Sequence, residues 1–237
     1  QGGISMLITI LGWQGPGPGA DGACSGCLAE DENGSAVAID MGAGSLSRLM
    51  KAIDPKKLKA IILSHLHWDH ISDMLPLGYL AGMTDIPVFA PTRPAQAFDA
   101  LASLGWKIHP HEDMRVGDMQ ISFGPARHPV PCSSVRIECH GRVFVYTGDT
   151  NTHPGLAAFA RGADLLLADA GLREADWAEN KPHLSPALCG KLASEAGVRK
   201  MVITHLSPFN DKDLLLSEAS AVFPETTLAE GGLQLKV

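Results

Sequence analysis

The sequence predicts an α/β protein in which two β-sheets pack face to face with helices on their outer sides. Segments with strand-like and helix-like patterns alternate in both halves of the chain. No segment repeats at the fixed period that is typical of a solenoid. The chain has 237 residues and no stretch with the composition of a linker. We therefore expect residues 6–237 to form a single domain with a substantial core.

Turn-forming residues divide the first half of the chain into short elements. Residues 6–12 predict a first strand, and the segment Gly15-Pro16-Gly17-Pro18-Gly19 then predicts a loop that continues to Leu28. Short apolar runs predict strands, and stretches with apolar residues at helical spacing predict helices. The expected strands are 37–41, 60–63 and 87–90, and the expected helices are 45–53, 73–83 and 94–104.

The second half begins with a change to short strands and turns. Residues 119–123, 134–139 and 142–147 predict strands, the last two joined by a turn at His140-Gly141. Strand and helix patterns then alternate again up to the end of the chain. The expected strands there are 165–169, 200–204 and 233–237, and the expected helices are 185–196 and 211–222.

Composition and charge exclude several classes of function. The formal net charge of -7, with dispersed lysines and arginines, disfavours general nucleic-acid binding. The apolar runs have the length of strands, so neither a membrane span nor the apolar part of a signal peptide is expected, and a cytoplasmic location follows as the default. The odd number of five scattered cysteines fits a reducing compartment.

Two short segments carry no function in this interpretation. Cys24-Ser25-Gly26-Cys27 is a single pair without a second one, so we expect a structural role in a loop rather than a zinc or redox site. Residues 1–5 precede Met6 and carry no pattern, which is typical of an expression remnant.

The segment His65-Leu66-His67-Trp68-Asp69-His70 carries four metal-binding side chains. It follows a buried-strand pattern, so these side chains lie at the carboxyl end of a strand, where α/β proteins place active sites. His65 and His67 point the same way while the chain is extended, and the turn after them brings Asp69 and His70 around a second position. One segment then serves two divalent ions. Zinc fits this set of donors best, with manganese or iron as alternatives.

Three further donors follow apolar runs later in the chain. His128 lies in the proline-rich segment Ala126-Arg127-His128-Pro129-Val130-Pro131, where the prolines predict a rigid loop. Asp149 ends the strand pattern Val145-Tyr146-Thr147-Gly148-Asp149, and His205 ends Met201-Val202-Ile203-Thr204-His205. Donors at successive strand ends indicate a site for two metal ions.

With these motifs the chain resembles the metallo-β-lactamase fold superfamily, and within it the ribonuclease Z-like branch of phosphodiesterases. The resemblance extends over nearly the whole chain from Met6, and also includes Asp40-Met41-Gly42 and Thr204-His205-Leu206-Ser207-Pro208. It implies a four-layer αββα sandwich of two mixed β-sheets. It also implies that His65, His67 and His128 bind one ion, that Asp69, His70 and His205 bind the other, and that Asp149 bridges them.

Departures from other branches narrow the function that the resemblance implies. The lactamase branch has a cysteine where this chain has Asp149, and glyoxalase II-like thioesterases have a helical domain for which residues 206–237 are too few. The arm with which transfer-RNA processing enzymes grip their substrate has no room in the hairpin between His128 and Asp149. Whole transfer RNA is therefore an unexpected substrate, and the arm-less phosphodiesterases that act on a small or cyclic phosphodiester or a nucleotide are the better match.

Further residues have roles that the resemblance or their position suggests. His183, in Lys181-Pro182-His183-Leu184-Ser185, matches the histidine that assists the leaving group in this branch, unless Ser185 simply caps a helix there and His183 is incidental. Asp69 is a candidate acceptor of the proton of the nucleophile. Asp40 and Asp169, at strand ends, are candidates for orienting imidazoles or for ordinary turns. The remaining histidines are expected at the surface: His109, His111, His140 and His153.

The predicted activity is hydrolysis by a hydroxide that bridges the two ions, since such ions lower the pKa of water to about 7. Two alternatives stay open. The same centre would hydrolyse a thioester or a lactone, and a chain with these ligands would also serve as a metal-stabilised binding module without turnover. The sequence leaves open whether the chain forms a homodimer.

Overall fold

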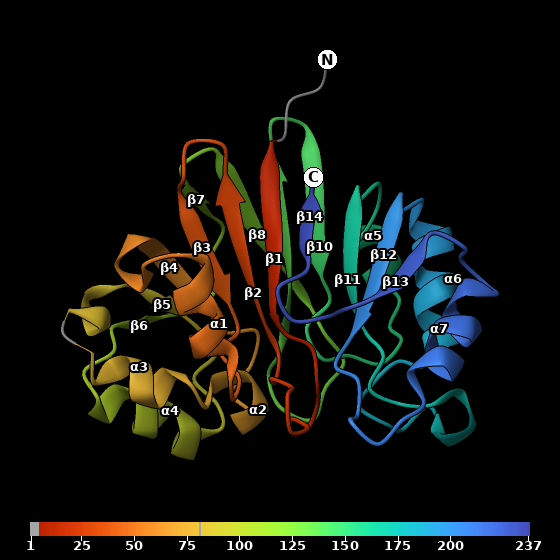
Figure 1. Cartoon of the computed structure of the whole chain (residues 1–237), viewed down its shortest axis with the longest axis horizontal. Coiled ribbons are helices and arrows are strands. Elements are labelled where there is room, and N and C mark those ends of the chain that lie inside the picture. The colour runs from red at the N-terminus through yellow and green to blue at the C-terminus, as the bar shows by residue number, and fades with distance from the viewer. Residues whose placement is uncertain (1–4, 81) are drawn as a thin grey trace.

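A computed structural model describes residues 5–80 and 82–237 of the chain. In these ranges, fourteen strands form two seven-stranded sheets that face each other, with helices on the two outer sides (Figure 1). The four-layer αββα arrangement expected from the sequence is confirmed. No helix of the described ranges has both the length and the apolar character that a membrane span needs.

The first sheet contains the N-terminal strands and the last one. Its order is β14-β1-β2-β3-β4-β5-β6, and the strands from β3 to β6 are parallel, whereas β1 pairs antiparallel with both β14 and β2. The strands are β1 (Met6–Gly12), β2 (Gly26–Asp31), β3 (Ala36–Ile39), β4 (Leu58–Ile62), β5 (Val88–Phe89), β6 (Ile108–His109) and β14 (Gln234–Lys236).

The second sheet begins with antiparallel strands and ends with parallel ones. Its order is β13-β12-β11-β10-β9-β8-β7, with antiparallel pairs from β7 to β10 and parallel pairs from β10 to β13. Both sheets are mixed, as expected. The strands are β7 (Met114–Val116), β8 (Met119–Pro125), β9 (Ser133–Cys139), β10 (Arg142–Tyr146), β11 (Leu165–Asp169), β12 (Lys200–Thr204) and β13 (Thr226–Leu228).

Helices lie outside each sheet (Figure 1). Those beside the first sheet are α1 (Ser45–Ala52), α2 (Trp68–Ile71), α3 (Met74–Gly78) and α4 (Ala95–Ser103), and those beside the second are α5 (Leu156–Phe159), α6 (Pro186–Ala196) and α7 (Lys212–Ser220). Short 3-10 turns occur at η1 (Pro55–Lys57), η2 (Met83–Asp85) and η3 (Glu174–Asp176).

The alternation of side chains along the strands produces two separate layers of core. Ile8 and Ile10 of β1 point between the sheets, where they join Phe144 of β10 in one buried cluster. Leu11 points to the other side and joins a second cluster with Leu49 of α1. Full burial of such a side chain contributes about 1.5–3 kcal/mol, so these clusters hold the sheets and helices in fixed positions.

Several expected boundaries are wrong. The loop expected to last until Leu28 already ends at Gly26, where β2 starts. The helix expected at 73–83 is only the short α3, followed by η2 from Met83, because Gly82 adopts a left-handed conformation with φ of 80° that an α-helix cannot continue through. Ala81 of that range and residues 1–4 of the expected expression remnant lie outside the described residues.

Candidate metal centre

The loops that follow four strands meet at one end of the sandwich, at the bottom in Figure 1. The segment from His65 to His70 follows β4 and includes the start of α2. His128 follows β8, Asp149 follows β10 and His205 follows β12. The structure thus brings together all seven residues that the sequence singled out as metal ligands.

One group of donors consists of three histidines and an aspartate. Ligand atoms of His65, His67, His128 and Asp149 all lie within 4.8 Å of one another. The Nδ1 atom of His67 is 3.1 Å from the Nε2 atom of His65 and 3.1 Å from the Nε2 atom of His128. These three nitrogens surround one position.

A second group lies beside the first and shares Asp149 with it. Ligand atoms of Asp69, His70 and His205 lie within 4.8 Å of one another. The Oδ1 atom of Asp149 is 3.3 Å from Nε2 of His70, and its Oδ2 atom is 3.3 Å from Nε2 of His205 and 3.7 Å from Nε2 of His65. Asp149 therefore lies between the two groups.

Hydrogen bonds behind the cluster fix the orientation of its imidazoles. Asp40 is fully buried, and its Oδ2 atom accepts hydrogen bonds from Nδ1 of His70 at 2.8 Å and from the hydroxyls of Ser64 and Tyr146. Because the hydroxyl proton of Ser64 goes to Asp40, its oxygen accepts from Nδ1 of His65 at 3.1 Å. The Nε2 atoms of His65 and His70 are thus left without protons and face the cluster.

This arrangement fits divalent cations. His128 donates from Nδ1 to the carbonyl of Pro182 at 3.3 Å, so its Nε2 also presents a lone pair to its neighbours. Nδ1 of His67 can donate a proton to only one of the two Nε2 atoms that lie 3.1 Å from it, so at least one of these lone pairs stays unpaired unless a cation lies among the three rings. Two buried atoms that face each other in the cluster also have no hydrogen-bond partner, Nε2 of His70 and Oδ1 of Asp149. Imidazole and carboxylate donors of this kind suit zinc, manganese and iron.

The charges within the cluster shift several pKa values. Burial lowers the pKa of His65 well below its usual range, which keeps this imidazole neutral. Burial alone would raise the pKa of Asp149, but the imidazoles of His205 and His70 hold it well below its usual range. These two shifts favour the protonation states that bind a cation. Burial of His70 would lower its pKa, but the carboxylates of Asp149 and Asp40 raise it, so a cation would replace a proton there.

His183 lies beside the second group and forms a pair with Asp169. Its Nδ1 atom donates to Oδ2 of Asp169 at 2.8 Å. Burial would lower the pKa of His183, but the charge of Asp169 and the hydrogen bond to it raise this pKa to about 9. Ser185 makes no side-chain capping bond to α6, so the interpretation of this segment as a simple helix cap does not hold.

Two residues at this end of the molecule were not predicted from the sequence to contribute to the site. His111, expected at the surface, is partly buried, because Nε2 donates to the carbonyl of Leu63 at 3.0 Å and Nδ1 accepts from the hydroxyl of Ser133 at 2.8 Å. Asn151 is fully buried and binds the loop that leads to His183. Neither residue lies in a recognisable sequence motif. Only the closeness of Asn151 to Asp149 in the sequence could have indicated that it lies near the site.

The other histidines and the cysteines play no part in the cluster. His109 and His140 are exposed as expected, and His153 is partly buried. Cys24 and Cys27 are buried free thiols. Neither belongs to the His/Asp groups described above.

Two glycines lie against the cluster, Gly15 in the loop before β2 and Gly42 after β3. A Cβ atom added to Gly15 would overlap the imidazole of His205, and one added to Gly42 would overlap the backbone carbonyl of Asp69. These glycines allow the backbone to approach the two donors closely.

Comparisons with known proteins agree with this geometry. Residues 37–206 match the model of a beta-lactamase superfamily domain. The chain is 30% identical to the probable metallo-hydrolase YhfI of Bacillus subtilis over 96% of this chain and 98% of that protein. The crystal structure of YhfI covers 98% of this chain and 99% of its own, with a TM-score of 0.91.

Two more distant relatives have names that state an activity. Ribonuclease Z of Methanopyrus kandleri is 25% identical, with 98% of each chain covered. The structure of a diphosphatase of the PhnP family is similar in fold, with 21% identity, a TM-score of 0.73 and 98% of each chain covered.

Proposed function

The chain belongs to the ribonuclease Z-like branch of the metallo-β-lactamase superfamily and is a metallo-hydrolase, and from this premise we propose that it is a phosphodiesterase for a small or cyclic phosphodiester or a nucleotide. The observation that carries the proposal is the position of Asp149 between two groups of His and Asp donors. Paired sites of this kind suit the displacement of one phosphate ester oxygen by another oxygen.

Two divalent ions, zinc in the first place, would be held by these donors. His65, His67 and His128 would bind one ion, and Asp69, His70 and His205 the other, with Asp149 contributing to both. Ions so bound supply a water of lowered pKa and neutralise charge that develops on the phosphate oxygens. Ser64 and Asp40 already orient the imidazoles of His65 and His70, so these side chains would hold the ions without a rearrangement of the chain.

The protein groups would handle the protons. Asp69 is 11% exposed, and its Oδ2 atom is 3.1 Å from Nε2 of His205, so this carboxylate lies at the surface of the cluster and can accept the proton of the nucleophile. His183 is 17% exposed, and because its Nδ1 proton is held by Asp169, its Nε2 atom is the one that can donate to the leaving oxygen.

A small substrate is favoured over whole transfer RNA. Strands β9 and β10, between His128 and Asp149, are joined by a turn of only two residues, His140 and Gly141, so no long arm extends from this place. The net charge of -7 also disfavours a large polyanion.

A panel of substrates tests the proposal. Zinc-loaded protein is assayed with bis(p-nitrophenyl) phosphate, cyclic mononucleotides, a thioester, a lactone and a transfer-RNA precursor, with His65→Ala as the inactive control. The proposal expects hydrolysis of the phosphodiesters and loss of at least about a hundredfold in the variant. Turnover of only the thioester or the lactone would overturn it. Activity on no ester, with His65→Ala affecting stability alone, would favour a binding module.

A further inference from the structure

A cavity of about 490 Å³ borders the candidate metal centre on the side of His128. Its walls come from the loops after β5 and β6 and from the loop between β8 and β9. They comprise residues 90–92, 110–111, 125–126 and 128–133. Cavities of roughly 300–1,000 Å³ hold small organic ligands, so this space is large enough for a substrate group.

The walls of this cavity are apolar and rigid. No residue that lines it is Lys, Arg, Asp or Glu. Five of the lining residues are prolines: Pro91, Pro110, Pro125, Pro129 and Pro131. Because proline fixes its own backbone angle, such walls keep their shape when a ligand enters. A preformed cavity reduces the entropy that binding costs.

His111 adds a fixed aromatic wall. Since the carbonyl of Leu63 can only accept, Nε2 of His111 carries the proton and Nδ1 accepts from Ser133, which leaves the ring neutral. The ring also stacks on Phe123, with 4.4 Å between the ring centroids and 8° between the planes. His111 thereby connects the end of β4 to the proline-rich loop.

His128 is shared by the cavity and the metal centre. Its Nε2 atom faces His67 at 3.1 Å, and its ring also lines the cavity. A phosphodiester held at the centre can therefore place one of its two ester groups in the cavity. A second phosphate on that group would lose water without meeting a positive charge, which is unfavourable.

We infer that this cavity binds the ester group that stays on the phosphate, and that this group is an uncharged nucleoside. The inference rests on the proposed phosphodiesterase function and names its substrate class: a diester with a nucleoside on one side and no further phosphate on that nucleoside. Apolar walls with a few polar groups, such as Thr92 and Ser133, match a flat base and a sugar.

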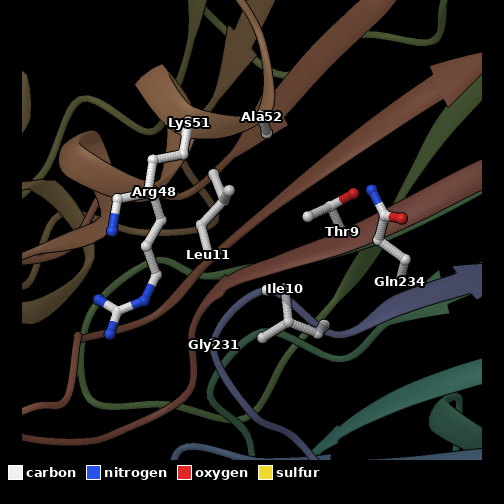
Figure 2. Close-up of a pocket in the computed structure, with 9 residues that line it drawn as sticks. Thr9, Ile10, Leu11, Arg48, Lys51, Ala52, Gly231 and Gln234 are labelled. Carbon is white, nitrogen blue, oxygen red and sulfur yellow. The ribbon is translucent and has the colours of Figure 1, made fainter.

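A second cavity, of about 260 Å³, lies between α1 and strands β1 and β14 (Figure 2). Figure 2 shows Arg48 and Lys51 of α1 on one side and Thr9 and Gln234 on the other. The guanidinium of Arg48 already donates to the carbonyl of Asp21 and lies over the ring of Trp13. This cavity shares no lining residue with the candidate metal centre, so it is not where we place the nucleoside.

Three p-nitrophenyl phosphodiesters with the same leaving group test the inference. They carry a methyl group, a 5′-linked thymidine, or the same thymidine with a 3′-phosphate. The expected kcat/KM of the thymidine ester exceeds that of the methyl ester by about tenfold or more, because binding of the remote group is used in the transition state. The added 3′-phosphate should cancel this gain.

Matched threonine variants locate the effect. Thr92 is exposed at the rim of the cavity, so Thr92→Trp should fold and should lower the ratio of kcat/KM between the thymidine and methyl esters about tenfold. Thr227 is exposed on strand β13 outside this cavity, and Thr227→Trp should keep the ratio of the unmodified chain. Melting temperature and metal content are measured on both variants to verify folding.

The outcomes separate the two proposals. Equal kcat/KM for the methyl and thymidine esters, or an unchanged ratio in a folded Thr92→Trp variant, would overturn the assignment of the cavity while leaving the phosphodiesterase intact. Hydrolysis of none of the three diesters would instead contradict the phosphodiesterase itself.

Discussion

Gly15 lies directly against the imidazole of His205, so that a Cβ atom at position 15 would overlap the ring. The backbone N–H of Gly15 also donates to the carbonyl of Leu206 at 3.3 Å, which holds the loop in this position. We expect Gly15→Ala to displace His205 from Asp69 and Asp149. Activity should fall roughly a hundredfold, since small displacements of catalytic groups have effects of this size.

Gly17 provides the control for that substitution. It lies in the same loop, but a Cβ atom added to it would have no neighbour within 4 Å, so Gly17→Ala should retain metal and activity. Metal content after dialysis should fall from two ions per chain toward one in Gly15→Ala only. Equal metal content and activity in the two variants would show that the close approach of Gly15 has no function.

The pair of His183 and Asp169 predicts a dependence on the leaving group. If His183 donates a proton to the leaving oxygen, His183→Ala should lower kcat for an alkyl leaving group by about 10²–10⁴, and much less for p-nitrophenolate, which leaves without a proton. Asp169→Asn should likewise lower kcat more for the alkyl leaving group than for p-nitrophenolate. His109→Ala, on the exposed side of β6, serves as the control. A loss that is equal for both leaving groups would rule out proton donation.

Asn151 predicts a further effect on the loop before His183. Its Nδ2 atom donates to the carbonyls of Lys181 at 2.7 Å and Ala178 at 3.1 Å, and its Oδ1 atom accepts from the indole N–H of Trp177 at 3.0 Å. Removing the amide leaves these partly buried groups without their partner, so Asn151→Ala should lower the free energy of unfolding by about 2 kcal/mol.

Limited digestion checks this loop directly. Endoproteinase Glu-C should cut after Glu179, whose carbonyl also accepts from Nδ2 of Asn151 at 3.3 Å, faster in Asn151→Ala than in the unmodified chain, because the loop opens more often. Asn33→Ala is the matched control, since Asn33 is exposed and its side chain makes a bond to Asp118 far along the chain from this loop. Identical cutting rates in both variants would mean that Asn151 does not hold the loop.

Metal removal predicts a loss of stability. Without cations, at least one of the Nε2 lone pairs of His65 and His128 and the buried Oδ1 atom of Asp149 would be uncompensated. Ions at about 1,000 times their dissociation constant stabilise a protein by about 4 kcal/mol per site. Chelation should therefore lower the melting temperature by roughly 8–16 °C for each ion, on the scale typical of a chain of this length. A melting curve that the chelator does not change would contradict the fit of cations to this cluster.

Much of the fold followed from local patterns in the sequence. The apolar runs that form β1, β4, β11 and β12 are long enough to be recognised, and their carboxyl ends marked the positions of His65 and His205. The strands β6, β7 and β13 have only two or three residues each, too few for a pattern, and they depend on pairing with neighbouring strands.

The candidate site was predictable where residues lie at strand ends, and not where their role depends on distant partners. His111 binds Leu63 and Ser133, which are 48 and 22 residues away, so its burial has no local signal. The same holds for Tyr146, which reaches Asp40 across 106 residues. Such contacts exist only once the two sheets have packed.

The most direct test of the paired centre is anomalous X-ray diffraction from crystals of protein purified without chelator, recorded at the absorption edge of the bound metal. We expect two peaks, one among His65, His67 and His128 and the other among Asp69, His70 and His205. Asp149 should contact both peaks. A single peak that does not involve Asp149, or density for metal only outside these residues, would contradict it.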